Sequence, residues 1–455
     1  MRRGEITNRI DVALYHPSYS ILLGKLEDSK FKVAKLEDLL EEETGIRYGT
    51  GTPPPIIEPN ANSLPFIRAT DIKDSQILLG GLLHINAKQD KSMDKCKVKA
   101  GELILVRSGV NTGDCAVVPQ SLDGGYAAYD LILRFNKKAL PYYVSYFLDT
   151  KIGRAQMNVR KGRAAQPHIN AEEVSSIKIP LPPLETQRAL IAEMETARAM
   201  RQSKLAQAES LLKGIDQFVL DELGLKLPKK IERKSYATRL KHIKTAQTLN
   251  SDYFHPERMN ALKTIQRNSP RLRVERLADI ADFIRDITTV QEDDNYIGLA
   301  SVQSNTGELV EVEETAEGQC FRYQKNDVLF GRLRPYLNKI RCAEEDGVCS
   351  TEFHVIRLRK RSNPKEEISP EYLAVILRSS IILAQTKHMM TGNTHPRLTN
   401  DDVVNLIVPI PRDIKAQSKI VTELQKRRSQ ARSLREEAER QWREAKEKFE
   451  KALLG

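Results

Sequence analysis

The chain has 455 residues, enough for about three domains of ordinary size. Hydrophobic residues make up 40% and charged residues 29%, a balance that excludes a disordered chain and indicates globular domains. The formal net charge of +11 is typical of, though not limited to, proteins with a polyanionic partner. The five cysteines form no CxxC pair, so the sequence predicts neither a zinc site nor a disulfide framework.

The amino-terminal segment MRRGEITNRIDVAL has no apolar core of signal-peptide length. No apolar run approaches the roughly 20 residues that a membrane helix needs. The sequence therefore predicts a cytoplasmic protein with reduced thiols and no membrane partner.

The first predicted domain, residues 1–183, mixes strands and helices. Short apolar runs punctuated by Gly, Asn and Asp predict strands at 103–106 and 131–135, and helical spacing of apolar residues predicts a helix over 142–150. The domain ends in IPLPP (179–183), which must be extended because proline fixes φ and removes a backbone donor.

A long helix is predicted over residues 184–224, followed by a linker over 225–249. Apolar residues recur there at steps of three and four, separated by Glu, Arg, Lys and Gln, as in a coiled-coil seam. The predicted seam residues of this helix are Ile191, Met194, Leu205, Leu212, Ile215 and Val219. Arg198 occupies a place in the same stripe.

Residues 250–412 repeat the order of motifs of the first domain at a separation of about 230 residues. CKVKAGELILVR (96–107) corresponds to CFRYQKNDVLFGR (320–332), and GRAAQPHINAEEV (162–174) corresponds to GNTHPRLTNDDV (392–403). Several blocks in the same order predict a tandem duplication of a whole domain plus a helix.

The second copy has the same predicted elements, including a strand at 328–330 and a helix at 371–380. A second long helix is predicted over 413–455, with seam residues Val421, Leu424, Leu434, Trp442 and Phe449. The predicted fold class is α+β: two tandem mixed α/β domains, each followed by a long helix, with the two helices packed as an antiparallel coiled coil.

Sequence motifs for catalysis are missing. The chain has no GxxxxGK[ST], HExxH or GxSxG motif and no methyltransferase tetrad of the Asn-Pro-Pro-Tyr type, so no catalytic or metal-binding residue is predicted. His16 and His255 each precede a proline at equivalent places of the repeat. We interpret both as capping or packing residues.

Three windows contain several cations and no acid: residues 151–171, 328–343 and 372–400. Cations in such windows neutralise phosphates, and Arg, Asn and Gln can read base edges. The residues predicted to contact DNA are Arg107, Ser108, Asn111, Thr112, Arg160, Lys161, Arg163, Gln166, Arg332, Arg334, Asn338, Lys339, Lys387, Asn393, Thr394, His395 and Arg397. Lys161 and Lys339 are expected at phosphates and Arg107 and Arg332 at bases.

Duplication on a helical spacer has a geometric consequence. Each globule can contact its own stretch of duplex, and the paired helices set the gap between the two half-sites. Because the copies diverge most in their middle parts, the two half-sites are expected to differ in sequence.

These motifs resemble the specificity (S) subunit of type I restriction-modification systems. The resemblance is carried by VLFGRLRPYLNKI (328–340), STEFHVIRL (350–358), GNTHPRLTNDDV (392–403) and IPLPPLETQ (179–187). It implies that 1–183 and 250–412 are target recognition domains of a non-catalytic subunit. It also implies docking of two methyltransferase subunits and of restriction/translocase subunits, which would bind S-adenosylmethionine, ATP and Mg²⁺, while this chain binds no cofactor.

The second proline block, IVPIPRDIKAQ, departs from the pattern by lacking a proline and carrying an extra residue, which predicts an altered junction with the second long helix. The opening DVALYHPSY is also unusual for this family. Three alternatives stay open: the DNA-targeting subunit of a type IIB enzyme, a self-contained nuclease or methyltransferase, and a coiled-coil scaffold without a DNA role.

Overall fold

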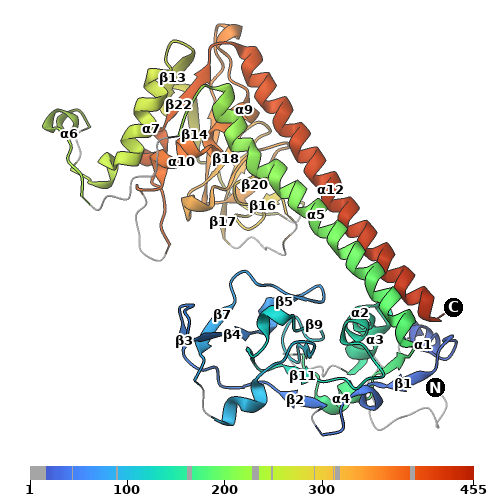
Figure 1. Ribbon diagram of the computed structural model, residues 1–455. Coiled ribbons are helices and arrows are strands. Elements are labelled where there is room, and N and C mark those ends of the chain that lie inside the picture. Colours follow the sequence, from blue (N-terminus) through green and yellow to red (C-terminus); the bar gives the residue numbers. More distant parts are fainter. Residues whose placement is uncertain are drawn as a thin grey trace. The chain divides into compact units, whose positions relative to one another are not determined.

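The computed structural model describes residues 17–43, 45–88, 91–160, 167–227, 235–246, 249–291, 293–310, 312, 318–389 and 395–454. The chain divides into two compact units. Unit 1 is Met1–Leu205 with Glu436–Gly455, and unit 2 is Ala206–Arg435. Each unit therefore contains a mixed globule and a segment of both long helices (Figure 1). Within the described residues, no helix is both long and apolar enough to cross a membrane.

Unit 1 is built on two four-stranded sheets. One has the order β2-β11-β8-β9 and is antiparallel, and the other has the order β10-β4-β7-β3 with a parallel β4–β10 pair. The strands are β1 (Val33–Lys35), β2 (Ile46–Tyr48), β3 (Ile56–Ile57), β4 (Ser63–Ile67), β5 (Ile72–Lys73), β6 (Gln76–Ile77), β7 (Leu83–Asn86), β8 (Leu103–Leu105), β9 (Cys115–Val117), β10 (Tyr126–Ala127), β11 (Leu131–Leu133) and β12 (Lys178–Pro180).

The helices of unit 1 cover the antiparallel sheet. They are α1 (Pro17–Gly24), α2 (Pro141–Leu148), α3 (Lys151–Arg160), α4 (Ala171–Ser175) and the start of α5 (Leu184–Glu222). Tyr143 and Phe147 of α2 share a core with Leu103 and Leu131 of the sheet. The strands predicted at 103–106 and 131–135 and the helix predicted at 142–150 are confirmed as β8, β11 and α2.

Unit 2 repeats this architecture. Its antiparallel sheet has the order β14-β21-β18-β19, which matches β2-β11-β8-β9 strand for strand in chain order. The strands are β13 (Leu272–Arg276), β14 (Ala281–Ile284), β15 (Ile287–Thr289), β16 (Tyr296–Ile297), β17 (Gln319–Tyr323), β18 (Val328–Gly331), β19 (Ile340–Cys342), β20 (Gly347–Ser350), β21 (Phe353–Leu358) and β22 (Ile407–Pro411).

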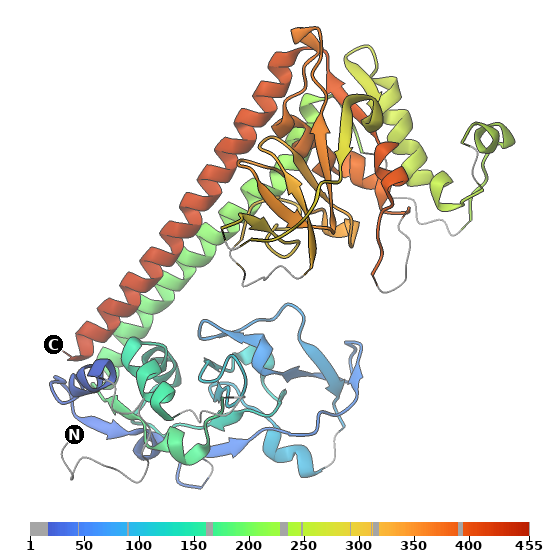
Figure 2. The ribbon, with the colours of Figure 1, turned by 180° about the vertical axis from the view of Figure 1, so that it is seen from behind.

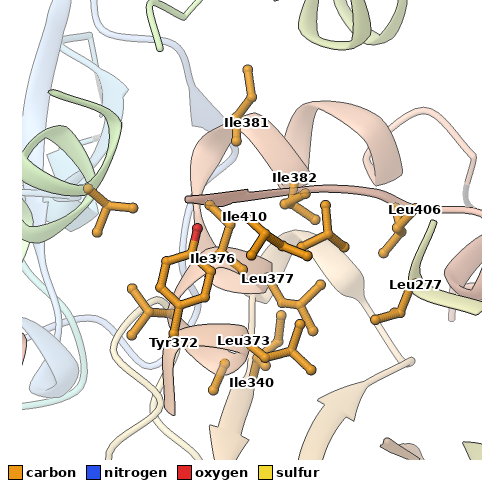
Figure 3. Close-up of a cluster of buried hydrophobic side chains, with 14 of the residues drawn as sticks. Leu277, Ile340, Tyr372, Leu373, Ile376, Leu377, Ile381, Ile382, Leu406 and Ile410 are labelled. Carbon is orange, nitrogen blue, oxygen red and sulfur yellow. The ribbon is translucent and has the colours of Figure 1, made fainter. Parts of the chain in front are cut away.

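The helices of unit 2 enclose its core. They are α6 (Leu240–Ala246), α7 (Pro256–Arg267), α8 (Leu277–Ile280), α9 (Pro370–Arg378), α10 (Ser380–Thr386), α11 (Asn400–Val404) and the start of α12 (Ile414–Leu454). Figure 3 shows Tyr372, Leu373, Ile376 and Leu377 of α9 gathered with apolar side chains from α10, β19 and β22. The segment predicted as a linker, 225–249, includes α6, and Leu225 is buried in the same core.

The duplication extends to individual hydrogen bonds. The hydroxyl of Tyr143 donates to the carbonyl of Pro180 (2.5 Å), and that of Tyr372 donates to the carbonyl of Pro409 (2.7 Å). The side-chain amide of Gln156 makes a pair of bonds with the backbone of Lys178. Gln385 makes the same pair with Ile407. The proline-rich strands β12 and β22 are therefore fixed in the same way in both units.

The start of each long helix is also held alike. Gln187 accepts from the amide of Leu140 (2.8 Å), and Gln417 accepts from the amide of Ser369 (3.1 Å). The sequence predicted an altered junction at IVPIPRDIKAQ. For this contact the prediction is wrong, because Gln417 reaches the equivalent loop despite the extra residue. The described bounds of α5 and α12 lie close to the predicted 184–224 and 413–455.

The two long helices pack antiparallel within each unit (Figures 1 and 2). In unit 1, Glu193 pairs with Lys448 (2.8 Å) and Arg201 with Glu439 (2.8 Å). In unit 2, the carbonyl of Gly214 accepts from Arg427 (2.7 Å). Of the predicted seam residues, Met194, Val219, Leu424, Trp442 and Phe449 are buried, and Ile191, Leu205, Leu212, Ile215, Val421 and Leu434 are half-buried.

Candidate nucleic-acid interface

In unit 1, two loops that are distant in sequence are joined by backbone hydrogen bonds. The loop that follows β8 begins at Arg107, whose carbonyl accepts from the amide of Ile169 (2.8 Å). The amide of Gly109 donates to the carbonyl of Pro167 (3.1 Å), and Ser108 forms an isolated bridge with His168. Gly109 has a φ of +88°, which a residue with a side chain rarely adopts. The two predicted DNA-contacting loops therefore meet at one end of the antiparallel sheet.

Unit 2 joins the corresponding loops with the same bonds. The amide of Leu398 donates to the carbonyl of Arg332 (3.1 Å), and the amide of Arg334 donates to that of Pro396 (2.7 Å). Leu333 and Arg397 form the isolated bridge. Arg107 and Arg332 therefore occupy equivalent positions, each just beyond an inner strand of its sheet, β8 or β18.

Arg107 is held by aromatic rings. Its guanidinium carbon lies 4.4 Å from the ring centre of Tyr129 and 4.9 Å from that of Tyr48, both of which are partly exposed. Its Nε is buried and has no hydrogen-bond partner among the described residues. Cation–π contact restrains the side chain without using its N–H donors, which leaves the donors for a ligand.

A buried acid lies directly behind Arg107. Asp130 accepts from the backbone amide of Arg107 (3.2 Å) and is only 2% exposed. Burial raises the pKa of Asp130 to about 6, a shift that the amide hydrogen bond and the charge of Arg107 partly oppose.

The remaining predicted residues of this loop divide into exposed and internal ones. Val110 at the tip is fully exposed, and the side-chain Nδ2 of Asn111 donates weakly to the carbonyl of Ala69 (3.4 Å). Thr112 is buried, and its hydroxyl contacts the carbonyls of Gly109 (2.5 Å) and Pro167 (3.1 Å). Thr112 therefore shapes the loop rather than presenting a surface to a ligand.

In unit 2, the cationic loop is a tight turn with left-handed residues at both ends. Arg334 (φ +48°) and Asn338 (φ +53°) flank the short 3₁₀ helix Pro335–Leu337. Asn338 is buried and donates to the carbonyl of Arg378 (2.7 Å), so it holds the turn to α9. The Nε of Arg334 is buried without a hydrogen-bond partner in the described part of the chain, and Tyr336 is half-exposed.

Arg332 lies beside a partly buried histidine, His354. Burial, together with the positive charge of Arg332, lowers the pKa of His354 to about 4. His354 is therefore neutral at pH 7, and the cationic character of this site comes from its arginines.

Several predicted cations have protein partners that their acid-free sequence windows did not reveal. Glu352 forms a two-pronged ion pair with Arg397 (2.5 Å), and Glu257 pairs with Lys387 (2.6 Å). Lys339 donates to the carbonyl of Leu299 (2.8 Å). Arg160 donates to the hydroxyl of Ser176 (2.9 Å) and the carbonyl of Gln156 (2.8 Å), which makes it part of the scaffold.

Lys161, Arg163, Gln166, Asn393 and Thr394 lie outside the described residues. His395 is exposed beside Arg397. His16 also lies outside, while the ring of His255 caps α7 by accepting from the amide of Glu257 (3.3 Å), as expected for a capping residue.

Sequence reasoning missed the residues that surround the arginines. Tyr48 and Tyr129 both contact Arg107 but are 81 residues apart in the sequence, and neither stands in a cationic window. Glu352 stands within the noted motif STEFHVIRL, but the motif does not show which cation it meets. The pairing of β11 with both β2 and β8, and of β18 with β21, brings these residues together.

Comparison with known proteins adds an independent result. The family described as "Type I restriction modification DNA specificity domain" matches residues 28–210 and 273–437. The type I restriction enzyme EcoDI specificity subunit of Escherichia coli is 20% identical over 274 residues, which is 57% of this chain and 57% of that subunit. The match thus spans little more than half the length of this relative.

Two solved structures match most of the chain, and the first of them has a similar fold. One comes from work on complex assembly and conformational transition of the type I R-M system, with 17% identity, a TM-score of 0.50, and coverage of 93% of this chain and 96% of that one. The other is the HsdS subunit from Thermoanaerobacter tengcongensis, with 16% identity, a TM-score of 0.38, and coverage of 93% and 97%.

Proposed function

Because the chain belongs to the type I restriction-modification DNA specificity family, whose members are non-catalytic specificity subunits, we propose that it recognises a bipartite duplex site with one half-site for each globule. The observation that carries this proposal is the pair of equivalent loop junctions. In each, an arginine follows an inner strand and a second loop is fixed beside it by the same backbone bonds.

The proposed contacts differ between the two globules. In unit 1, Arg107 contacts a base edge, with Ser108 and Asn111 beside it, and Val110 packs against sugar or a thymine methyl group. In unit 2, Arg332 and Arg334 contact bases, while Lys339, His395 and Arg397 contact the backbone. Arginine suits the base-reading role because its planar fork matches the two acceptors of guanine in the major groove.

The proposed partners follow from the family and not from this chain's geometry. Two methyltransferase subunits would supply adenine methylation with S-adenosylmethionine, and restriction/translocase subunits would use ATP and Mg²⁺. The antiparallel helices are the proposed spacer between the half-sites, and the unlike side chains of the two loop junctions predict an asymmetric site.

A domain exchange tests the modular recognition. Residues 250–412 are replaced by the corresponding domain of another specificity subunit, and the recognised site is determined by methylation mapping of the complex assembled with methyltransferase subunits. We expect one half-site to change while the other and the gap stay the same. A change in both half-sites contradicts the assignment of one globule to each.

A binding assay tests the DNA role itself. Affinity of the assembled complex for its site should fall steeply with salt, because neutralised phosphates release counterions. Salt-insensitive or absent binding would instead favour a scaffold, and turnover by the purified chain with duplex, Mg²⁺ and S-adenosylmethionine would favour a self-contained enzyme.

A further inference from the structure

Two histidines and a glutamate, none of them a predicted DNA contact, meet in unit 2. His255 is the capping residue of α7, Glu257 lies in the first turn of that helix, and His388 follows the end of α10. Their potential ligand atoms all lie within 4.8 Å of one another. Sequence spacing could not reveal this cluster, because His388 is 131 residues from Glu257.

The ligand atoms are close to the separation that a metal ion requires. The Nε2 of His388 lies 3.0 Å from the Oε2 of Glu257. Two ligands at about 2.0–2.1 Å from a tetrahedral ion are roughly 3.3 Å apart, so the pair needs to open by only a few tenths of an ångström. The imidazole rings of His255 and His388 stack with their centres 3.5 Å apart, so one ring has to tilt before the in-plane lone pairs of both rings point at the same ion.

The backbone that carries these residues is held by the core. Ala261 and Ile265 of α7 are buried in one cluster with Ile381 and Ile382 of α10. Neighbouring side chains also orient the cluster: Tyr236 packs edge-on against His255 (5.5 Å), and the ammonium of Lys387 holds the other carboxylate oxygen of Glu257 (2.6 Å). Such outer contacts fix ligand orientation in metal sites.

We propose that His255, Glu257 and His388 form a binding site for a divalent transition ion of the zinc class. Two imidazoles and one carboxylate are a ligand set that Zn²⁺ accepts, with water in the fourth position, whereas Mg²⁺ prefers oxygen ligands. The cap bond from the amide of Glu257 to His255 is long (3.3 Å), so a metal competes with it at small cost.

The ion would connect the first turn of α7 to the segment that follows α10. That segment leads along the chain toward His395 and Arg397, two of the proposed DNA contacts. The site is therefore a structural metal site that links two segments of one recognition globule, with no role in catalysis. It depends only on the residues of unit 2 and stands whether or not the chain binds DNA.

Metal content and thermal melting of the full, tag-free chain test the proposal. The chain is treated with chelator, dialysed against Zn²⁺ and compared with His388→Gln, Glu257→Gln and the control His84→Ala, a histidine of unit 1. We expect wild type and the control to bind one more Zn²⁺ per chain than the two site variants bind. Wild type and the control should also melt at a higher temperature with Zn²⁺ than without it. Both site variants should lose at least ~10-fold in Zn²⁺ affinity.

All variants retain the five cysteines, so thiol binding cancels in the comparison. Equal Zn²⁺ binding by wild type and both site variants, or no binding by wild type, overturns the proposal. A melting shift of the same size with Mg²⁺ also overturns it. If one site variant fails to fold without metal, the other decides the result.

Discussion

The two globules share a scaffold but differ where the proposed DNA contacts lie. Tyr143 and Tyr372 make the same hydrogen bond to a proline-rich strand, and Arg107 and Arg332 occupy the same position after an inner strand. The surroundings of the arginines differ: two tyrosine rings contact Arg107, whereas Arg332 lies beside a neutral histidine. The backbone framework has thus been kept while the side chains that would meet DNA have changed.

The second sheets also differ in order. In unit 1 an inner place of this sheet, between β10 and β7, is taken by the early strand β4. In unit 2 an inner place, between β16 and β17, is taken by β20, the last strand of that sheet in the chain. Each sheet retains one parallel pair at its edge. The duplication therefore tolerates rearrangement away from the antiparallel sheet that carries the loop junction.

The largest expected difference between the units comes from Asp130. Its place beside the inner strand corresponds to Phe353 in unit 2, so a buried acid exists only at the first of these two positions. The folded pKa of about 6 lies above the ordinary 3.8. Between about pH 4 and 6 the Asp130 carboxyl is therefore ionised in the unfolded chain but still protonated in the folded one. The free energy of unfolding falls as pH rises through this range.

Asp130→Asn should remove this loss of stability. At pH 7 we expect the variant to be more stable than wild type by on the order of 2–3 kcal/mol, with the difference vanishing near pH 4. Denaturant unfolding at both pH values measures it, with the exposed Asp28→Asn as control. A difference that is the same at both pH values contradicts a buried, titrating Asp130.

The next largest effect is expected at the two equivalent arginines. Arg107→Ala and Arg332→Ala should each lower the affinity of the assembled complex by about 2 kcal/mol, roughly 30-fold, because each removes a base contact. Each variant should relax specificity in a different half-site. Binding at fixed salt to duplexes with single base changes measures this, with the exposed Arg276→Ala as control. Uniform weakening over all sequences would place the arginines at phosphates.

Much of the fold could be predicted because it rests on patterns of local sequence. The strands β8, β11 and β18 and the helices α2 and α9 follow from apolar periodicity, and the duplication follows from ordered motifs. The candidate site was predicted less well, because its composition depends on contacts between distant strands. Thr112 and Asn338 have the polar character of base-reading residues, yet both are buried and build the turns.

The acid-free windows illustrate the same limit. A window shows the charges along the chain but not an acid that folding brings in from a distant segment, such as Glu352 paired with Arg397. The zinc-class cluster was missed for the same reason, because no short spacing connects His388 to α7. Local patterns define elements, whereas a site formed from separate elements appears only after folding.

A smaller effect tests the shared scaffold. Tyr143→Phe and Tyr372→Phe each remove one buried hydrogen bond and leave a proline carbonyl without its partner. We expect each to lower the free energy of unfolding by about 1.5 kcal/mol, with similar values for the two variants. Calorimetry of the full chain measures them. A large difference between the variants would mean that the two proline-rich strands are not held equivalently.

The smallest expected effect concerns Glu352, which pairs with Arg397 next to the proposed duplex surface. Glu352→Gln removes a negative charge there and frees the guanidinium, so affinity for DNA should rise about threefold at low salt and less at high salt, as screening increases. The control is Glu366→Gln, an exposed acid near Arg273. A fall in affinity would instead show that Glu352 orients Arg397 for its contact, making Glu352 a positioning residue. In that case Arg397→Ala and the double variant should bind equally weakly, because the carboxylate acts only through the arginine.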